Sequence, residues 1–288
     1  MAPDQYSAVW ISHTAIKDFQ NCPRAYYLKH VYRDPKTGHK IKIMTPPIAL
    51  GQVVHEVIEE ISRLPAADRF SEPLLSRLHR LWDTVTGKKG GFWDANNELR
   101  FKQRAESMMQ RLTDHPGPLR NPAVKMQGDL PHFWLSEEDN IMLCGRLDWM
   151  EYIADSESVR IIDFKTSKHD EENGSLQLPI YHLLAHYCQK RPVTGVSYWY
   201  LDRIDGLIAL PIPNLVSSQN MILAIAKQIK VSRQLDRFKC PKDGCAYCAP
   251  FEAILAGKGE CIGIDSFGSD IYIVPQETHT SEQESVIL

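Results

Sequence analysis

The length, composition and charge of the chain describe an ordinary folded protein and exclude several classes. With 288 residues, 43% of them hydrophobic and 24% charged, the chain can bury a substantial core. Its net charge of −3 provides no global attraction to nucleic acid, so any DNA binding depends on a local basic groove. The sequence has no run of about 18 apolar residues and no signal peptide, so we expect a cytoplasmic protein that does not bind membranes.

The amino-terminal part of the sequence predicts helices. A first helix is interrupted near Pro23, because proline disfavours helical backbone at the residue that precedes it. Residues 51–61 predict a second helix, on which His55 and Glu59 lie one turn apart on the same face. A helical lobe is expected over about residues 66–120, where apolar side chains recur at helical spacing.

Residues 131–165 predict a β-meander that carries two acids and a lysine. One apolar run, residues 141–143, precedes Asp148, and a second apolar run ends in Asp163 and Lys165. Side chains alternate between the two faces of a strand, so Asp163 and Lys165 project from the same face. If the two runs pair, both carboxylates meet at one sheet end, where they can hold a divalent cation. A solvated ion pair at a strand end is the alternative.

The carboxy-terminal half predicts alternating helices and strands. On the first of these helices Gln177 and Tyr181 are four residues apart and share a face. The aromatic run 198–200 is expected in the core, with stacking on unpaired bases as the alternative. The predicted elements are helices over 176–189, 216–235 and 251–256, strands over 196–201 and 207–212, and a polar tail over 275–288.

Taken in order, these motifs resemble the RecB-like branch of the PD-(D/E)XK nuclease superfamily over roughly residues 10–265. The matching motifs are Cys22-Pro23-Arg24, Gly51 to His55 with Glu59, Gly145 to Asp148, Asp163-Phe164-Lys165-Thr166, and Gln177-x-x-x-Tyr181. The resemblance implies a single α/β domain of the restriction-endonuclease type, with a central mixed β-sheet flanked by helices. It also implies a helical insertion at about 66–120 and a cysteine-bound C-terminal clip over 240–261.

The resemblance assigns a role to each motif. It implies a metal site for Mg²⁺ or Mn²⁺ formed by His55, Asp148, Asp163 and the backbone carbonyl of Phe164. Lys165 would position or activate the attacking water, and Gln177 and Tyr181 would position the substrate.

The implied activity is that of a metal-dependent phosphodiester hydrolase. We expect an exonuclease that acts on single-stranded DNA ends in repair, recombination, or the processing of CRISPR or phage DNA. The alternative is a nuclease-silent DNA-binding or scaffolding subunit of a larger helicase–nuclease or adaptation complex. No Gly-x-x-x-x-Gly-Lys-Ser/Thr loop occurs in the sequence, so a helicase would have to be a partner protein.

The sequence has seven cysteines, and in a reducing compartment the clustered ones are candidate metal ligands. In iron–sulfur relatives, which include CRISPR-associated and AddB-type nucleases, one early and three late cysteines bind a 4Fe-4S cluster. The corresponding residues here are Cys22 and, late in the chain, Cys240, Cys245 and Cys248. The spacing of the late cysteines departs from that of these relatives, so a four-cysteine zinc site is the alternative, and Cys261 is a second candidate for the fourth ligand.

Overall fold

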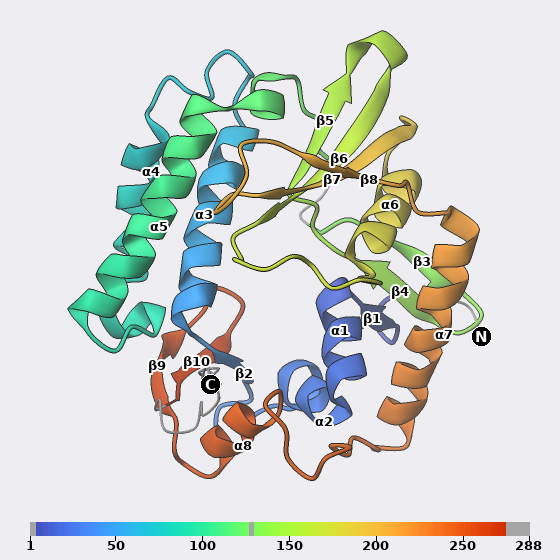
Figure 1. Ribbon diagram of the computed structural model, residues 1–288. Helices are drawn as coiled ribbons and strands as arrows, with labels where there is room; N and C mark the ends of the chain where they lie inside the picture. The colour runs from blue at the N-terminus through green and yellow to red at the C-terminus, as the bar shows by residue number, and fades with distance from the viewer. Residues whose placement is uncertain (1–3, 127–129, 275–288) are drawn as a thin grey trace, which may run out of the picture. The chain divides into compact units, whose positions relative to one another are not determined.

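The computed structural model describes residues 4–126 and 130–274, in two compact units (Figure 1). The first unit runs to Ile16 and resumes over Pro46–Val231, and the second contains Lys17–Thr45 and the described residues from Ser232 onward. The tail predicted over 275–288 lies outside the described residues. Within the described part of the chain, no helix has both the length and the apolar character needed to cross a bilayer.

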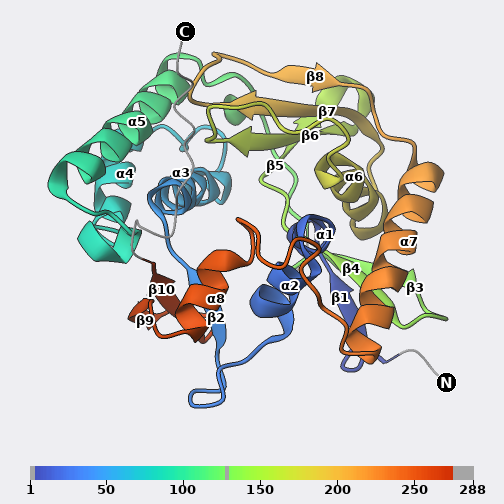
Figure 2. The same cartoon turned by 60° about the horizontal axis from the view of Figure 1, so that its bottom comes forward.

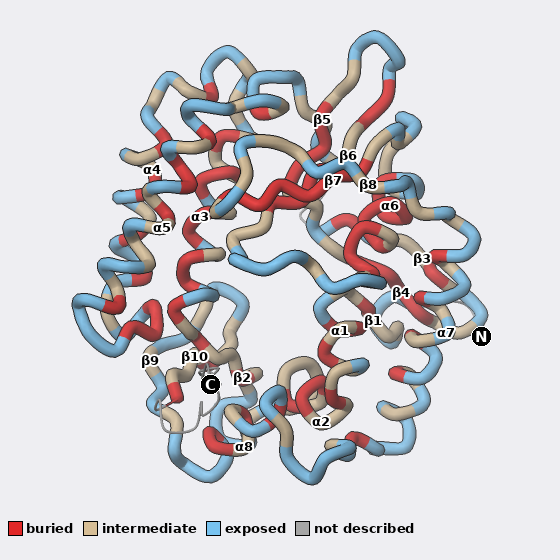
Figure 3. Tube along the Cα trace, viewed as in Figure 1, coloured by how far each residue is buried: buried red, intermediate tan, exposed pale blue. Residues whose placement is uncertain are grey.

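A mixed four-stranded sheet forms the core of the first unit. Its two central strands, β6 (Ser158–Lys165) and β7 (Val193–Tyr200), are parallel to each other, and each has an antiparallel partner on its outer side. Strands β6 and β7 are buried over most of their length (Figure 3), as expected for central strands of a sheet that is covered on both faces. The aromatic run 198–200 on β7 is buried, as expected for core residues. In order, the strands are β5 (Trp149–Ile153), β6 (Ser158–Lys165), β7 (Val193–Tyr200) and β8 (Ile208–Leu210).

A three-stranded sheet in the same unit corrects the predicted meander. It consists of β1 (Val9–Ile11), β4 (Ile141–Cys144) and β3 (His132–Ser136), with β4 in the middle. The predicted pairing of residues 141–143 with the strand of Asp163 is therefore wrong. The chain leaves β4 at Gly145, and the strand that pairs with β6 is β5, which begins directly after Asp148. Gly145 also allows close packing, because a Cβ there would lie 2.9 Å from Leu184 Cδ1.

The predicted helical lobe is present in the first unit. It contains α4 (Leu74–Trp82) and α5 (Ala95–Asp114), which pack side by side with α3 (Pro46–Ser62), the helix predicted over 51–61 (Figures 1 and 2). A short 3-10 turn (Gly87–Gly90) separates α4 from α5. Asp94 caps α5 by accepting a hydrogen bond from the Asn97 amide at 2.7 Å. The other long helices are α6 (Gln177–Cys188), which contacts β3 and β7, and α7 (Leu215–Gln234).

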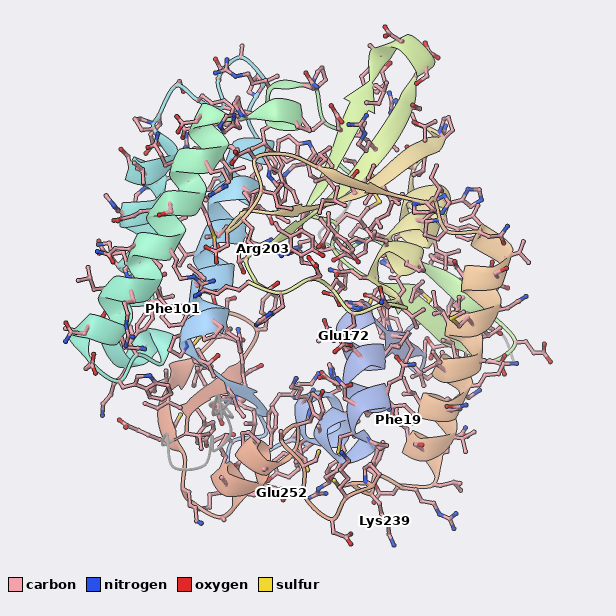
Figure 4. All side chains as sticks on the ribbon, viewed as in Figure 1. Phe19, Phe101, Glu172, Arg203, Lys239 and Glu252 are labelled. Carbon is pink, nitrogen blue, oxygen red and sulfur yellow. The ribbon has the colours of Figure 1, made fainter. Side chains whose placement is uncertain are left out.

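The second unit joins segments from the two ends of the described chain. In its small sheet β10 (Ser269–Ile273) is the middle strand. It is parallel to β2 (Lys40–Ile43) on one side and antiparallel to β9 (Glu260–Ile264) on the other. An ion pair from Arg24 Nε to Glu252 Oε1 (2.5 Å; Glu252 is labelled in Figure 4) connects its two helices α2 and α8. The elements are α1 (His13–Asn21, shared with the first unit), α2 (Pro23–Tyr26), a π-helical turn (Tyr27–Val31), β2 (Lys40–Ile43), α8 (Ala249–Leu255), β9 (Glu260–Ile264) and β10 (Ser269–Ile273).

Both units therefore contain mixed sheets flanked by helices, and the predicted α/β fold class is confirmed. The helix break at Pro23 is also confirmed, since α1 ends at Asn21. The sequence analysis missed the short strands β1, β2, β5, β9 and β10; β1 and β2 pair with distant segments, whereas β9 pairs with the neighbouring β10.

Candidate active site and thiol cluster

The two predicted carboxylates lie together at the end of β6. Asp163 is buried on β6, and Asp148 lies in the bend that leads into β5. The Phe164 backbone amide donates a hydrogen bond to Asp148 Oδ2 at 2.9 Å, which fixes Asp148 beside the strand. The Phe164 ring packs in the core against Trp199, with ring centroids 5.7 Å apart. The strand thus directs its apolar side chain inward and its acid toward the site.

His55 reaches the carboxylates from α3. Its Nδ1 lies 3.3 Å from Asp148 Oδ1. Desolvation acts to lower the pKa of His55, but the charge and hydrogen bonding of Asp148, together with the charge of Asp163, outweigh it and raise that pKa. Glu59, one turn further along α3, pairs with Arg63 and Arg146, so its contacts differ from those of His55.

Lys165 lies among three oxygen-bearing side chains. Its Nζ is 3.0 Å from Asp163 Oδ2 and 3.2 Å from Glu171 Oε2, and it donates a hydrogen bond to Gln177 Oε1. Burial acts to lower the pKa of Lys165, but the two acids outweigh burial and raise it, so the amine is held as an ammonium. Glu171 was missed by the sequence analysis, because it lies in a polar loop between β6 and α6 that carries no motif.

Gln177 and Tyr181 support Asp163 from α6. Gln177 Nε2 donates to Asp163 Oδ1 at 2.7 Å and to Tyr181 Oη at 3.1 Å. Their predicted shared face is confirmed, since both side chains are buried beside Asp163. Gln177 therefore connects the acid, the lysine and the tyrosine in a single hydrogen-bonded network.

The electrostatics of this group favour a bound cation. Burial, followed by the charge of Asp148, raises the pKa of Asp163 to about 7. Asp163 Oδ2 is buried and accepts no hydrogen bond from the described residues, although it forms an ion pair with Lys165. Carboxylate oxygens suit Mg²⁺ and Mn²⁺, and an imidazole suits Mn²⁺. The residues present fit a hard divalent metal.

These side chains line one open cavity of about 560 Å³ in the first unit. A cavity of this size accommodates a nucleotide-sized ligand. Gln52, Glu56 and Glu171 also line this cavity. The lining includes every side chain that was predicted for the metal and substrate site: His55, Asp148, Asp163, Lys165, Gln177 and Tyr181.

The second unit contains a cluster of four thiols. The Sγ atoms of Cys22, Cys240, Cys245 and Cys248 all lie within 4.8 Å of one another, and those of Cys245 and Cys248 are 3.7 Å apart. Cys22 and Cys248 occupy the residues before α2 and α8, respectively. Cys261, the second candidate for the fourth ligand, lies on β9 outside this group.

Backbone amides stabilise one thiolate of the cluster. Hydrogen bonds from the amides of Lys242 and Gly244 lower the pKa of Cys240 to about 7, and the Gly244 nitrogen is 3.3 Å from Cys240 Sγ. Burial raises the pKa of Cys248 to about 12. Metal binding requires deprotonated thiols, and a soft metal would supply the positive charge that holds four of them together. The donor set fits zinc or an iron–sulfur cluster.

Comparison with known proteins agrees with this geometry. No curated protein matches the chain. Residues 10–251 match the family model of the PD-(D/E)XK nuclease superfamily, a range that includes the whole cavity lining and the four clustered cysteines. Because the match covers most of the chain, the protein belongs to the PD-(D/E)XK nuclease superfamily.

Proposed function

We propose that this protein is a divalent-metal-dependent DNA nuclease that works as an exonuclease on single-stranded ends. Membership of the superfamily supports phosphodiester hydrolysis. The observation that carries the proposal is the convergence of Asp148, Asp163 and Lys165 on one cavity together with His55. A lone ion pair at a strand end would not require a second acid and an imidazole beside it.

The proposed metal ligands are His55, Asp148, Asp163 and the carbonyl of Phe164. A divalent ion supplies polarisation of the scissile phosphate and a more acidic water. Lys165 would orient that water through its ammonium and stabilise negative charge that develops on the phosphate. Glu171 would help to hold the ammonium in place, because Lys165 contacts both Glu171 and Asp163.

The substrate and pathway are proposed from the resemblance to RecB-like nucleases. These act on DNA ends in repair, recombination, and CRISPR or phage DNA processing. The chain itself has no P-loop motif, so a helicase partner would supply any unwinding.

The test is a cleavage assay with end-labelled single-stranded, double-stranded and circular DNA in Mn²⁺ or Mg²⁺. Wild-type protein should shorten linear single strands and leave circles intact, and Asp163→Ala or Lys165→Ala should abolish the reaction. Exposed Arg100, on α5, offers a control substitution, Arg100→Gln, that should leave cleavage unchanged. Activity in EDTA, or full activity of Asp163→Ala, would refute the proposal. DNA binding that weakens with salt but never gives product would identify the nuclease-silent subunit instead.

The four thiols are proposed to bind a metal cofactor, with a 4Fe-4S cluster and zinc as the two candidates. Four thiolates around one tetrahedral zinc ion lie about 3.8 Å apart, as follows from a Zn–S distance of about 2.3 Å. The observed 3.7 Å between Cys245 and Cys248 is close to this value and favours a single ion. Metal analysis with an anaerobic absorption spectrum decides between them. Iron with broad absorbance would identify the cluster, and one equivalent of zinc in a colourless protein would exclude it.

A further inference from the structure

A second cavity of about 570 Å³ opens beside the active-site cavity. The two share four lining residues: Glu59, Arg146, Leu147 and Asp148. The second cavity therefore begins at the same bend of chain that places Asp148 in the active site. None of the residues that line only this second cavity has a role in the proposed chemistry.

Two arginines pair with one carboxylate in this second cavity, and a lysine also lines it. Glu59 Oε1 lies 2.8 Å from Arg63 Nη2, and Glu59 Oε2 lies 3.5 Å from Arg146 Nη1. Lys125 also lines the cavity; desolvation lowers its pKa, and the negative charge of Glu59 acts to raise it. The remaining acid, Asp148, directs its oxygens to His55 and the Phe164 amide. Positive charge is thus in excess on this side.

The two guanidinium groups are accessible to a ligand. The side chains of Arg63 and Arg146 are 66% and 58% exposed, and exposed ion pairs of this kind are weak. A phosphate could take over their hydrogen bonds at small cost, because guanidinium groups bind phosphate oxygens in a bidentate manner. Glu59 would hold both arginines near the required position in the free protein.

The local charge matches a terminal phosphate better than an internal one. A phosphate monoester carries a charge of about −1.5 to −2 near pH 7, whereas each internal phosphodiester carries about −1. Arg63, Lys125 and Arg146 carry +3 and Glu59 carries −1, a sum of +2. The other acid of the lining, Asp148, is left out of this sum because its oxygens face His55 and the Phe164 amide. The apolar side chains of Val124, Met126 and Leu147 on the remaining wall suit a sugar or base.

We propose that this cavity, which we call the end pocket, binds the phosphorylated terminal nucleotide of the DNA strand through Arg63, Lys125 and Arg146. The inference rests on the proposed nuclease function and deepens it, since a bound end would set which phosphodiester reaches the neighbouring active site. The shared chemistry is a phosphate monoester on a nucleotide, at either the 5′ or the 3′ end.

The test measures binding rather than cleavage. Fluorescently labelled oligonucleotides of one sequence, with a 5′-phosphate, a 3′-phosphate or hydroxyls at both ends, are titrated with full-length protein in EDTA at constant salt. One phosphorylated oligonucleotide should bind roughly tenfold more tightly than the hydroxyl-ended one, the scale of one charge-assisted hydrogen bond. Which of the two binds tightly identifies the end.

Matched variants localise the effect. Arg63→Gln and Arg146→Gln should each reduce the preference for phosphate to about threefold or less, whereas Arg100→Gln, on exposed α5, should preserve it. Equal binding of all three oligonucleotides by wild-type protein would overturn the proposal, as would an equal loss in Arg100→Gln. The two proposals can fail separately. Phosphate-dependent binding without cleavage would overturn only the nuclease proposal. Cleavage without a preference for a phosphorylated end would overturn only the end pocket.

Discussion

Replacing Gln177 with methionine removes the hydrogen-bonding centre of the active site while keeping a side chain of similar volume. The wild-type amide donates to Asp163 and Tyr181 and accepts from Lys165. Two of these bonds involve groups that carry charge, and each is worth about 1.5–3 kcal/mol. Taking the lower figure for both, we expect Gln177→Met to reduce the free energy of unfolding by about 3 kcal/mol.

The assay is urea denaturation in EDTA at pH 8, followed by circular dichroism. With a denaturant slope of about 2 kcal/mol per M, a loss of about 3 kcal/mol lowers the midpoint by about 1.5 M. Gln110→Met is a matched control on α5, because that exposed glutamine makes one hydrogen bond, to Asp114 Oδ1 at 3.0 Å. The control midpoint should change by less than about 0.3 M, as is usual for surface substitutions.

Activity provides a second readout of the same substitution. Without the amide, the Asp163 carboxylate and the Lys165 ammonium lose a shared anchor, and a displacement of about 1 Å typically costs about 10²-fold in rate. We expect kcat to fall by about this factor in Gln177→Met. If the variant had the stability and the kcat of the Gln110→Met control, the described network could not be the element that positions these two groups.

Three further outcomes are expected from charges and thiols elsewhere. Burial raises the pKa of Asp163 from its ordinary 3.8 to about 7, so the folded protein holds this proton more tightly than the unfolded chain. The free energy of unfolding in EDTA should therefore fall as pH rises from about 4 to 7. In denaturation experiments repeated across this pH range, Asp163→Asn should remove this part of the pH dependence. Burial acts to raise the pKa of Asp270, but hydrogen bonds from His39 and Thr37, with the charge of His39, together lower it. The stabilisation by Asp270 is therefore present at pH 7 and is lost as pH falls below about 4. Asp270→Asn should destabilise by about 2 kcal/mol at pH 7 and by much less at pH 3, and equal losses at both pH values would contradict this. Cys22→Ser should lower the bound metal measured by elemental analysis, whereas Cys261→Ser should not, and identical metal content in both variants would remove Cys22 from the ligand set.

Local patterns in the sequence were sufficient for the long helices and for the pairs of side chains within single elements, but not for several short strands. Strand alternation placed Asp163 and Lys165 on one face, and helical spacing placed Gln177 and Tyr181 on one face; both expectations agree with the structure. These features depend only on backbone periods of two and 3.6 residues, which neighbouring residues set by themselves. The resemblance to a nuclease family then ordered the motifs, and the family match agrees with it.

Contacts between distant segments were decided only in the tertiary structure. The sequence analysis paired residues 141–143 with the strand of Asp163, because nothing local distinguishes that partner from β5. It also missed Glu171, whose ion pair with Lys165 depends on how a polar loop returns over the strand. The sequence analysis likewise did not predict the parallel pairing of β2 with β10 or the ion pairs between Glu59 and its arginines. A short strand or a single charge has many possible partners along the chain, and only the packing of the whole core selects one of them.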